Sequence, residues 1–229
     1  QAPITLTTTG TGAATLSGTT LNIPTPNSGS SSAAVFLPTI VIGTQQWARL
    51  NLDVVTYRNG DIIPQVTDET TWNSLTTGAW CYYNNDPANA KYGKLYNWYA
   101  VIDSRGLAPV GYHIPTDEEW QKLVDYLGYD VGIKMKSTIG WAENERGTNE
   151  SGFTALGNGI VSATDGNIAS AWVLTTFTVW ANTLAPGTSY PILYAIGNDM
   201  PNFTKYVSNN ILGASEPKRH GCAVRCVKD

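Results

Sequence analysis

The chain has 229 residues, enough to bury a sizeable core, and its 14 Lys and Arg against 18 Asp and Glu give a net charge of −4. Because the sequence has no block of basic residues to neutralise phosphates, we expect no nucleic-acid binding. We also expect no membrane insertion, since the longest apolar run, at 33–42, is broken by Pro38 and is shorter than the roughly 18–20 residues that span a bilayer. Only 14% of the residues are charged, so Thr, Ser, Asn and Gly must keep the surface soluble, as in many secreted, cell-surface and virion proteins.

Residues 1–32 form a low-complexity segment rich in Thr, Gly and Ser, without a charged residue. The alternating runs ITLT at 4–7 and ATLS at 14–17 predict strands with one apolar face, and NSGSSS at 27–32 predicts a flexible linker. So little β-structure cannot bury a core by itself. We therefore predict a β-rich stalk or linker appendage at 1–32, which pairs with other copies, as in a homotrimer, or with the domain at 33–229.

The composition becomes that of a globular domain from residue 33 onward. Apolar runs predict short strands at 35–37, 40–42, 47–55 and 61–64, and the dipeptide Asn59-Gly60 predicts a turn before the last of them. Further along, a short helix with one buried stripe is predicted by apolar residues at i, i+3, i+4 and i+7, namely Leu95, Trp98, Tyr99 and Ile102. Strand alternation fits the same residues nearly as well, so both interpretations stay open.

The clearest predicted element is a helix in the segment IPTDEEWQKLVDYLG. Thr116 and Glu119 have the spacing of a capping box, and Gly128 supplies a C-terminal stop. The apolar stripe of this helix contains Trp120, Leu123, Val124 and Leu127. After residue 132 short strands alternate with long polar loops. In the last predicted strand, at 221–228, the alternating side chains of Cys222, Val224 and Cys226 lie on the same face. Together these elements predict a compact α+β domain.

Five segments of this domain resemble one protein family. They are IGTQQWARLNLDVVTYRNGDIIP, TTGAWCYYNNDPANAKYGKLYNWYAV, GLAPVGYHIPTDEEW, TNESGF and VRCVKD, in this order between residues 42 and 229. The pattern is similar to that of the Fibrobacter succinogenes major paralogous domain, a relative of the formylglycine-generating-enzyme branch of the C-type-lectin-like fold. The resemblance implies a C-type-lectin-like domain with a twisted antiparallel sheet, one or two helices at one side and long loops. The segment at 1–32 resembles segments that precede the terminal knobs of phage tail fibres.

The three cysteines allow one disulfide and one further thiol. His220, Cys222 and Cys226 are fewer than the about four ligands of a zinc site, and the spacing of the two cysteines does not fit a redox dithiol. Two residues four apart in a strand lie roughly 13 Å apart, too far for a disulfide. The family resemblance implies that Cys81 and Cys226 pair or lie adjacent, and that Cys222, at a family Phe position, is a small buried hydrophobe.

His113, in GYHIPTDEEW, is the usual residue type of a general base. No nucleophile or carboxylate dyad is evident around it in the sequence, so we expect it instead to fix the loop before the helix. The terminal VRCV resembles a stretch of the formylglycine-generating enzymes that is not their catalytic cysteine pair, and we predict no catalytic residue. Polar loops contain Asp86, Asp165 and Asp199, but none follows the spacing of an EF-hand. We therefore predict no cofactor, with calcium as the weaker alternative.

The segment at 166–215 has the composition of a recognition surface. It contains two charged residues, Asp199 and Lys205, among many aromatic, Asn, Ser and Thr residues, as an antibody paratope does, and such groups also suit sugar faces and hydroxyls. The family pattern is lost at 171–194, which favours a surface specialised for a ligand. The alternative is that half of these aromatic residues belong to the core, as we expect for Trp172, which matches a family tryptophan. The predicted ligand-binding residues are Phe177, Trp180, Asn182, Tyr190, Tyr194, Asn198, Asp199, Asn202, Phe203 and Tyr206.

These features predict a non-enzymatic, extracellular recognition module. We expect a receptor-binding knob of a phage tail fibre or a bacterial surface adhesin, which binds a host cell-surface glycan or protein through its C-terminal loops. One alternative is an oxidase or hydrolase on a scaffold like that of the formylglycine-generating enzymes. Another is a structural stalk cap whose loops bind only neighbouring subunits.

Overall fold

The computed structural model describes residues 37–142, 146–163, 175–198, 200–210 and 216–229, together with three short strands before residue 23. The chain divides into two compact units, Gln1–Ala33 and Ala34–Asp229. The first unit contains a sheet in which β3 (Thr20–Asn22) lies between β1 (Thr5–Thr7), parallel to it, and β2 (Thr15–Ser17), antiparallel to it. The two strands predicted in this segment are thus present as β1 and β2, whereas the linker predicted at 27–32 lies outside the described residues.

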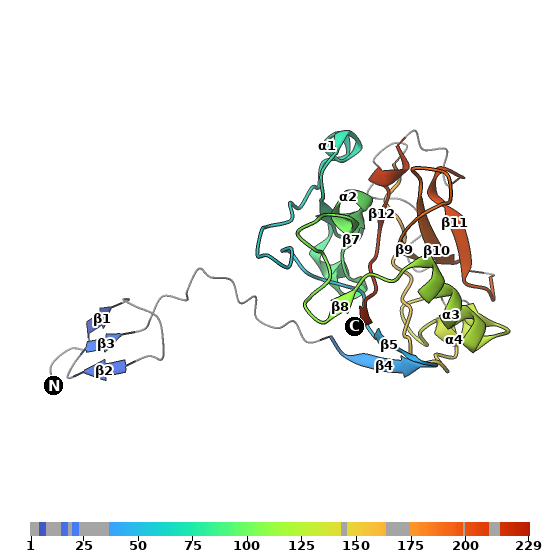
Figure 1. The fold of residues 1–229 in the computed structure, drawn as a ribbon, viewed down its shortest axis with the longest axis horizontal. Helices are drawn as coiled ribbons and strands as arrows, with labels where there is room; N and C mark the ends of the chain where they lie inside the picture. The colour runs from blue at the N-terminus through green and yellow to red at the C-terminus, as the bar shows by residue number, and fades with distance from the viewer. Residues whose placement is uncertain are drawn as a thin grey trace. The chain divides into compact units, whose positions relative to one another are not determined.

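The second unit contains three small sheets and four α-helices within its described residues (Figure 1). The first sheet has the order β4 (Thr39–Ile42), β5 (Gln45–Ala48), β13 (Val227–Lys228), β8 (Tyr112–His113). The second has the order β12 (Gly221–Cys222), β7 (Leu95–Asn97), β6 (Trp80–Cys81), and the third has the order β11 (Thr204–Val207), β10 (Pro191–Ile196), β9 (Phe177–Leu184). The helices are α1 (Glu69–Ser74), α2 (Trp98–Val101), α3 (Asp117–Leu127) and α4 (Val131–Met135). Antiparallel pairing with separate helices makes this an α+β fold.

Helix α3 confirms the strongest local prediction. The Thr116 hydroxyl accepts from the Glu119 amide at 3.3 Å, and the Glu119 carboxylate accepts from the Thr116 amide at 2.9 Å, so both bonds of the capping box form. The helix ends at Leu127, before Gly128, whose φ is +65°. Trp120 and Leu123 are fully buried on its inner face.

The helix predicted at 95–102 is only partly present. Leu95 lies in β7, where it pairs with Cys81 of β6, and the helix begins at Trp98. The Asn97 side chain sets this boundary, because its oxygen accepts from the amide of Ala100 at 3.1 Å and caps α2. Ile102 follows the helix and is exposed rather than part of a buried stripe. Similarly, the strand predicted at 47–55 ends at Ala48, within β5.

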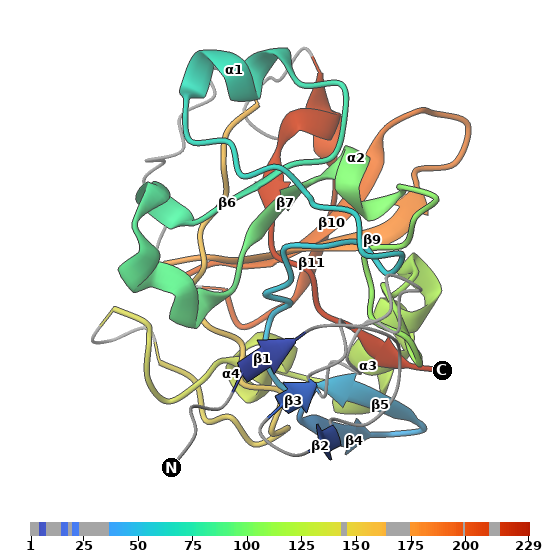
Figure 2. The same cartoon turned by 90° about the vertical axis from the view of Figure 1, so that its left-hand side faces the viewer.

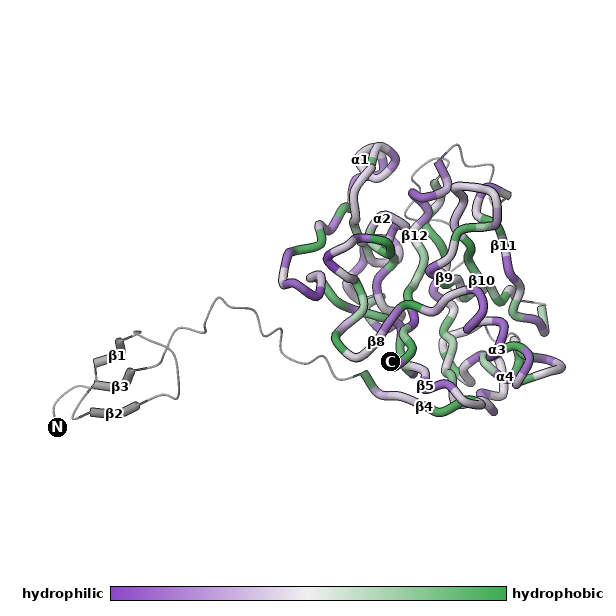
Figure 3. The backbone as a smooth tube through the Cα atoms, viewed as in Figure 1, coloured by the Kyte–Doolittle hydropathy of each residue, from purple (hydrophilic) through white to green (hydrophobic). Residues whose placement is uncertain are grey.

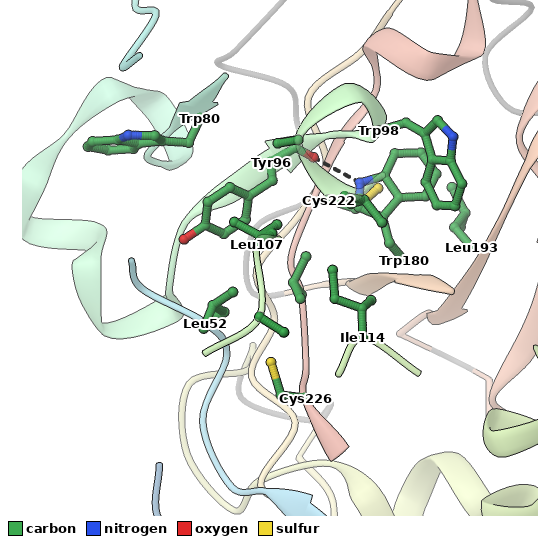
Figure 4. Close-up of a cluster of buried hydrophobic side chains, with 14 of the residues drawn as sticks. Leu52, Trp80, Tyr96, Trp98, Leu107, Ile114, Trp180, Leu193, Cys222 and Cys226 are labelled. Carbon is green, nitrogen blue, oxygen red and sulfur yellow. Dashed lines mark hydrogen bonds between the residues drawn. The ribbon is translucent and has the colours of Figure 1, made fainter. Parts of the chain in front are cut away.

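The sheet of β9, β10 and β11 is covered on both faces. One face packs on α3 and α4 through the buried cluster that contains Trp120, Phe177 and Tyr194, which we name the α3 cluster. The other face packs on the cluster that contains Trp180, Leu193 and Cys222, named the Cys222 cluster and drawn in Figure 4. Successive residues of β10 therefore face opposite clusters, and Figure 3 shows this strand as hydrophobic over most of its length.

The C-terminal segment joins the three sheets, and it runs through the middle of the second unit between β7 and β9 (Figure 1, Figure 2). The Trp180 amide of β9 donates to the Ala223 carbonyl at 3.1 Å, while β12 pairs with β7. Farther along, the Ala48 amide donates to the Cys226 carbonyl at 2.8 Å, and Val227 pairs with both β5 and β8. The strand predicted at 221–228 is present only as the two short strands β12 and β13, and this segment is the one around which the domain closes.

Candidate functional site

A hollow of about 260 Å³ lies beside the last paired residues of β9 and β10, at Asn182 of β9. Its polar lining comes from Arg58, Asp103, His113 and Asn182, and its apolar lining includes Ile102. We name it the Asn182 hollow, because Asn182 is the predicted ligand-binding residue that lines it. The hollow brings together residues that are more than 100 positions apart in the sequence.

Asn182 is held at the hollow by its backbone. Its backbone N–H donates to the Pro115 carbonyl at 2.7 Å, and the neighbouring Thr183 hydroxyl accepts from the backbone N–H of Asp117 at 2.9 Å. These bonds fasten the end of β9 to the start of α3. The Asn182 side chain is exposed and makes no hydrogen bond within the described part of the chain, so its side-chain amide is available to a ligand.

Arg58 and Asp103, two charged side chains that line the hollow, are held by hydrogen bonds to other groups of the protein. The Arg58 guanidinium donates to the carbonyls of Ala108 and Tyr112, each at 3.0 Å, and so braces the loop that forms one wall. Hydrogen bonds from Arg105 lower the pKa of Asp103 to about 2, which keeps this carboxylate ionised at neutral pH. Arg58 and Asp103 therefore shape the hollow and leave the Asn182 amide as its open polar group.

His113 is fixed by two carboxylates. Its Nε2 lies 2.8 Å from Glu119 Oε1, and its Nδ1 lies 2.8 Å from Asp229 Oδ1. Burial alone would lower the pKa of His113, but these two carboxylates outweigh it and the net shift is upward. Because both ring nitrogens are engaged, neither is placed to take a proton from a substrate. The geometry agrees with the expected structural role, which ties the start of α3 to the C-terminus.

Four of the predicted ligand-binding residues belong to the core. Phe177 and Trp180 are fully buried, Tyr194 is 1% exposed and Phe203 is 5% exposed. The Trp180 indole nitrogen donates to the Tyr96 carbonyl at 2.8 Å, as the dashed line in Figure 4 shows. The structure therefore assigns these four side chains to the interior and not to a ligand-binding surface. The physical reason is that other elements cover both faces of β9 and β10.

The remaining predicted residues do not form one surface. Asn182 and the exposed Tyr190 lie at one end of β10, whereas Asn198 and Asn202 lie in the loop beyond its other end, after Ile196. A strand of this length separates its two ends by roughly 17 Å. Tyr206 lies on β11 and packs partly buried against the Cys222 cluster, and Asp199 lies outside the described residues. Of the predicted set, Asn182 and Tyr190 are thus the candidates for one binding surface.

All three cysteines are buried, unpaired thiols. Cys226 shares the cluster of Cys222, whereas Cys81 packs in a separate cluster with Trp72, so the predicted Cys81–Cys226 disulfide is not formed in the structure. Burial raises the pKa of Cys226 to about 12 and raises those of Cys81 and Cys222 as well. Such thiols carry little of the reactive thiolate. The expectation that Cys222 is a small buried hydrophobe is confirmed by its full burial.

The described residues provide no group of three His, Cys, Asp or Glu side chains arranged to bind a metal ion. Asp86, one of the calcium candidates, instead accepts from the Ala88 amide at 2.9 Å and caps the 3₁₀ segment Pro87–Tyr92. The other two candidates, Asp165 and Asp199, lie outside the described residues. In the same described part of the chain, no helix has the length and apolar character needed to cross a membrane.

Sequence reasoning missed Arg58, Ile102 and Asp103 as neighbours of Asn182. They lie far from the segment at 166–215, and only the tertiary fold brings them to β9. One signal was present, because Asp103 and Arg105 are the charged residues of the otherwise uncharged stretch at 95–112.

Comparison with protein families gives one match, to the model described as the Fibrobacter succinogenes major domain (Fib_succ_major), over residues 40–228. Comparisons with curated proteins and with solved structures give no match. The matched region includes the Asn182 hollow, the three buried cysteines and the C-terminal segment that joins the sheets. The chain therefore belongs to the Fibrobacter succinogenes major domain family.

Proposed function

We propose that this chain is a non-enzymatic, extracellular recognition module. It acts as the receptor-binding knob of a phage tail fibre or as a bacterial surface adhesin, and its ligand is a cell-surface glycan or protein. The observation that carries the proposal is the Asn182 hollow, where an unpaired amide lies beside the apolar wall of Ile102. The β9–β10 hairpin that follows exposes 43% of Leu184 and 36% of Tyr190.

The chemistry of this surface suits recognition. The Asn182 amide offers both a donor and an acceptor, and a tyrosine supplies rigid contact area at low entropic cost. A volume of about 260 Å³ is just below the usual range for ligand pockets, so the hollow accommodates one sugar ring or one side chain of a larger ligand. The exposed hairpin would then contact the rest of that ligand.

The groups with catalytic potential favour recognition over an oxidase or hydrolase. The cysteines are buried and their pKa values are raised, both nitrogens of His113 are engaged, and Asp103 is held by Arg105. A nucleophile needs an adjacent base or a lowered pKa, and a general base needs a free proton-accepting atom. None of these three kinds of group, as placed among the described residues, meets that requirement.

The architecture supports the C-type-lectin-like fold that the family resemblance implies. Its described sheets in the second unit are antiparallel, α3 and α4 pack on one face of the β9–β11 sheet, and long loops connect the elements. The first unit has strands of three residues each, which supports a stalk that is completed by other copies.

The test is binding of the fluorescently labelled full chain to candidate host bacteria. We expect Asn182→Ala and Tyr190→Ala each to weaken binding about tenfold, whereas Tyr129→Ala, a substitution at a tyrosine that is 87% exposed, leaves it unchanged. Wild-type affinity in both Asn182→Ala and Tyr190→Ala would remove the Asn182 hollow and the β9–β10 hairpin beside it as the binding site. A wild-type chain that binds neither host cells nor their isolated surface glycans would overturn the recognition function itself.

A further inference from the structure

A second surface, built from the β4–β5 turn and α3, has the features of a ligand site. Tyr126 of α3 is 66% exposed and stands between two hollows of about 420 Å³ and about 350 Å³, lining both. We propose that Tyr126 is the stacking platform of a carbohydrate-binding groove, which we name the Tyr126 groove. It shares no lining residue with the Asn182 hollow and is independent of it.

One side of the Tyr126 ring lies against the backbone of the β4–β5 turn. It packs on Gly43, where an added Cβ would lie 3.0 Å from two ring carbons. Gly43 and Thr44 form the two-residue turn between β4 and β5, and the φ of +62° at Gly43 suits a glycine there. The ring thus rests on bare backbone and presents its remaining surface to solvent. A pre-positioned aromatic ring loses little conformational entropy when a ligand binds.

Polar groups surround this ring on both sides. The larger hollow is lined by Thr44, Gln45, Lys122 and Asp125, and the smaller one by Lys134, Glu150 and Ser151. The two ammonium groups and two carboxylates balance in charge, and hydroxyl and amide groups lie among them. Neighbouring donors and acceptors match the adjacent hydroxyls of a sugar ring, while the Tyr126 ring matches its C–H face.

The balance of charge favours a neutral sugar over other ligands. A phosphorylated or strongly acidic ligand would need an excess of positive charge, which Asp125 and Glu150 cancel. Lys134 is also partly engaged, since its Nζ donates to the Leu127 carbonyl at 2.8 Å. A docked peptide helix would need a continuous apolar stripe. Here the apolar lining, which is the Tyr126 ring with Val41, Ile42 and Leu127, is interspersed with polar and charged groups. The groove therefore fits one or two rings of a neutral glycan.

Saturation-transfer difference NMR of the full chain with glucose, galactose, mannose and N-acetylglucosamine tests the Tyr126 groove. We expect transfer to the ring C–H protons of at least one sugar. Tyr126→Ala should weaken its binding roughly tenfold, and Tyr126→Phe should keep it. Tyr129→Ala, at an exposed tyrosine three positions along, and Asn182→Ala, in the other hollow, should leave it unchanged.

Asp125→Asn provides a second variant that leaves the packing of Tyr126 on Gly43 in place, in case Tyr126→Ala lowers the melting temperature. We expect it to weaken sugar binding several-fold. The proposal is overturned if no sugar receives saturation from the wild-type chain, or if transfer survives both Tyr126→Ala and Asp125→Asn when each is combined with Asn182→Ala. Equal loss in Tyr129→Ala or Asn182→Ala would also overturn it. Host-cell binding that fails while sugar binding at Tyr126 persists would count against the proposed recognition function alone.

Discussion

The guanidinium carbon of Arg225 lies 4.3 Å from the centre of the Phe153 ring, and both side chains are fully buried. Its nitrogens donate to Asn51 Oδ1 at 3.1 Å, to the Ala48 carbonyl at 3.0 Å and to the Phe153 carbonyl at 2.9 Å. Burial lowers the pKa of Arg225 to about 9, still above neutral pH, so the side chain remains charged. The Arg225 guanidinium thus ties the C-terminal segment to the end of β5, to Asn51 and to the loop at Phe153.

We expect Arg225→Met to lower the free energy of unfolding by about 3 kcal/mol or more, because three buried oxygens lose their donor. Arg225→Lys should lose most of the same stability, since an ammonium cannot reproduce the planar fork of a guanidinium. Urea unfolding followed by tryptophan fluorescence measures both. Arg49→Met, at an exposed position, is the control and should change stability by less than about 0.5 kcal/mol. A similar loss in Arg225→Met and Arg49→Met would contradict the bridging role.

Trp180→Ala should unfold or severely destabilise the domain rather than weaken ligand binding alone. Trp180 is fully buried, stacks edge-on against Trp98 at 5.4 Å between ring centroids, and donates to the Tyr96 carbonyl. Removing a buried tryptophan costs about 3–5 kcal/mol. Thermal melts check this, with Tyr190→Ala, at an exposed hairpin position, as the matched aromatic control. A Trp180→Ala variant that melts like the wild type but fails to bind cells would return Trp180 to the binding surface.

The contrast between α3 and β9 explains which features the sequence can predict. The capping box of Thr116 and Glu119 acts within four residues, so its pattern identifies the start of the helix without knowledge of the rest of the fold. In β9 both faces are covered, and burial removes the polar alternation that would have marked a strand. Aromatic and small polar residues in such a segment have the same composition in a core as in a paratope. The two interpretations, core and binding surface, differ in whether other elements cover the faces of β9, and those elements are distant in the sequence.

The same limit applies to the candidate site. Asn182 was among the predicted residues because the segment at 166–215 is rich in aromatic, Asn, Ser and Thr residues, and the structure places it where the buried pattern of β9 ends. Its neighbours were not, since Arg58 and Asp103 reach it only through the loop that Arg58 braces. Tyr126 also escaped prediction, because an exposed tyrosine on a helix becomes a candidate platform only when its ring is seen to rest on Gly43.

Titration of the thiols should find none reactive in the native protein and three after denaturation. Cys81 and Cys222 are fully buried and Cys226 is 1% exposed, and burial raises the pKa of each. Titration with an aromatic disulfide reagent, with and without guanidinium chloride, gives the count. A single reactive thiol in denaturant would show that two of the three cysteines form a disulfide, and peptide mapping would then show whether they are Cys81 and Cys226. Rapid reaction in the native state would reopen the oxidase alternative, because it requires an accessible thiolate.

The His113 cluster should stabilise the fold most in mildly acidic solution. The pKa of His113 is raised above its ordinary 6.5, so its contribution is complete below about pH 6.5 and is lost as the pH rises through the raised value. For Glu119, burial raises the pKa, but its hydrogen bonds to Thr116 and His113 lower it below the ordinary 4.5 overall. Its contribution is therefore present above about pH 4.5 and is lost as the pH falls through the lowered value.

Urea unfolding of the wild type and of His113→Asn at about pH 5.5 and about pH 8.5 isolates this effect from the other titrating groups. The difference in the free energy of unfolding between the wild type and His113→Asn should be larger at the lower pH. Glu119→Gln should shrink the same difference, because it removes one of the two charges that raise the pKa of His113. An equal difference at the two pH values would mean that His113 contributes through packing and not through its charge.

We expect the full chain to form a trimer, and residues 34–229 alone to form a folded monomer. The strands of the first unit are three residues long, and a sheet of such strands is too small to be stable without further partners. The second unit, by contrast, contains the buried clusters around Trp120, Trp180 and Trp72. Light scattering after size-exclusion chromatography gives the mass of the full chain and of 34–229, and circular dichroism checks the fold of the shorter chain. If both chains have the mass of a monomer, or both that of the same oligomer, the first unit is not the element that assembles the copies.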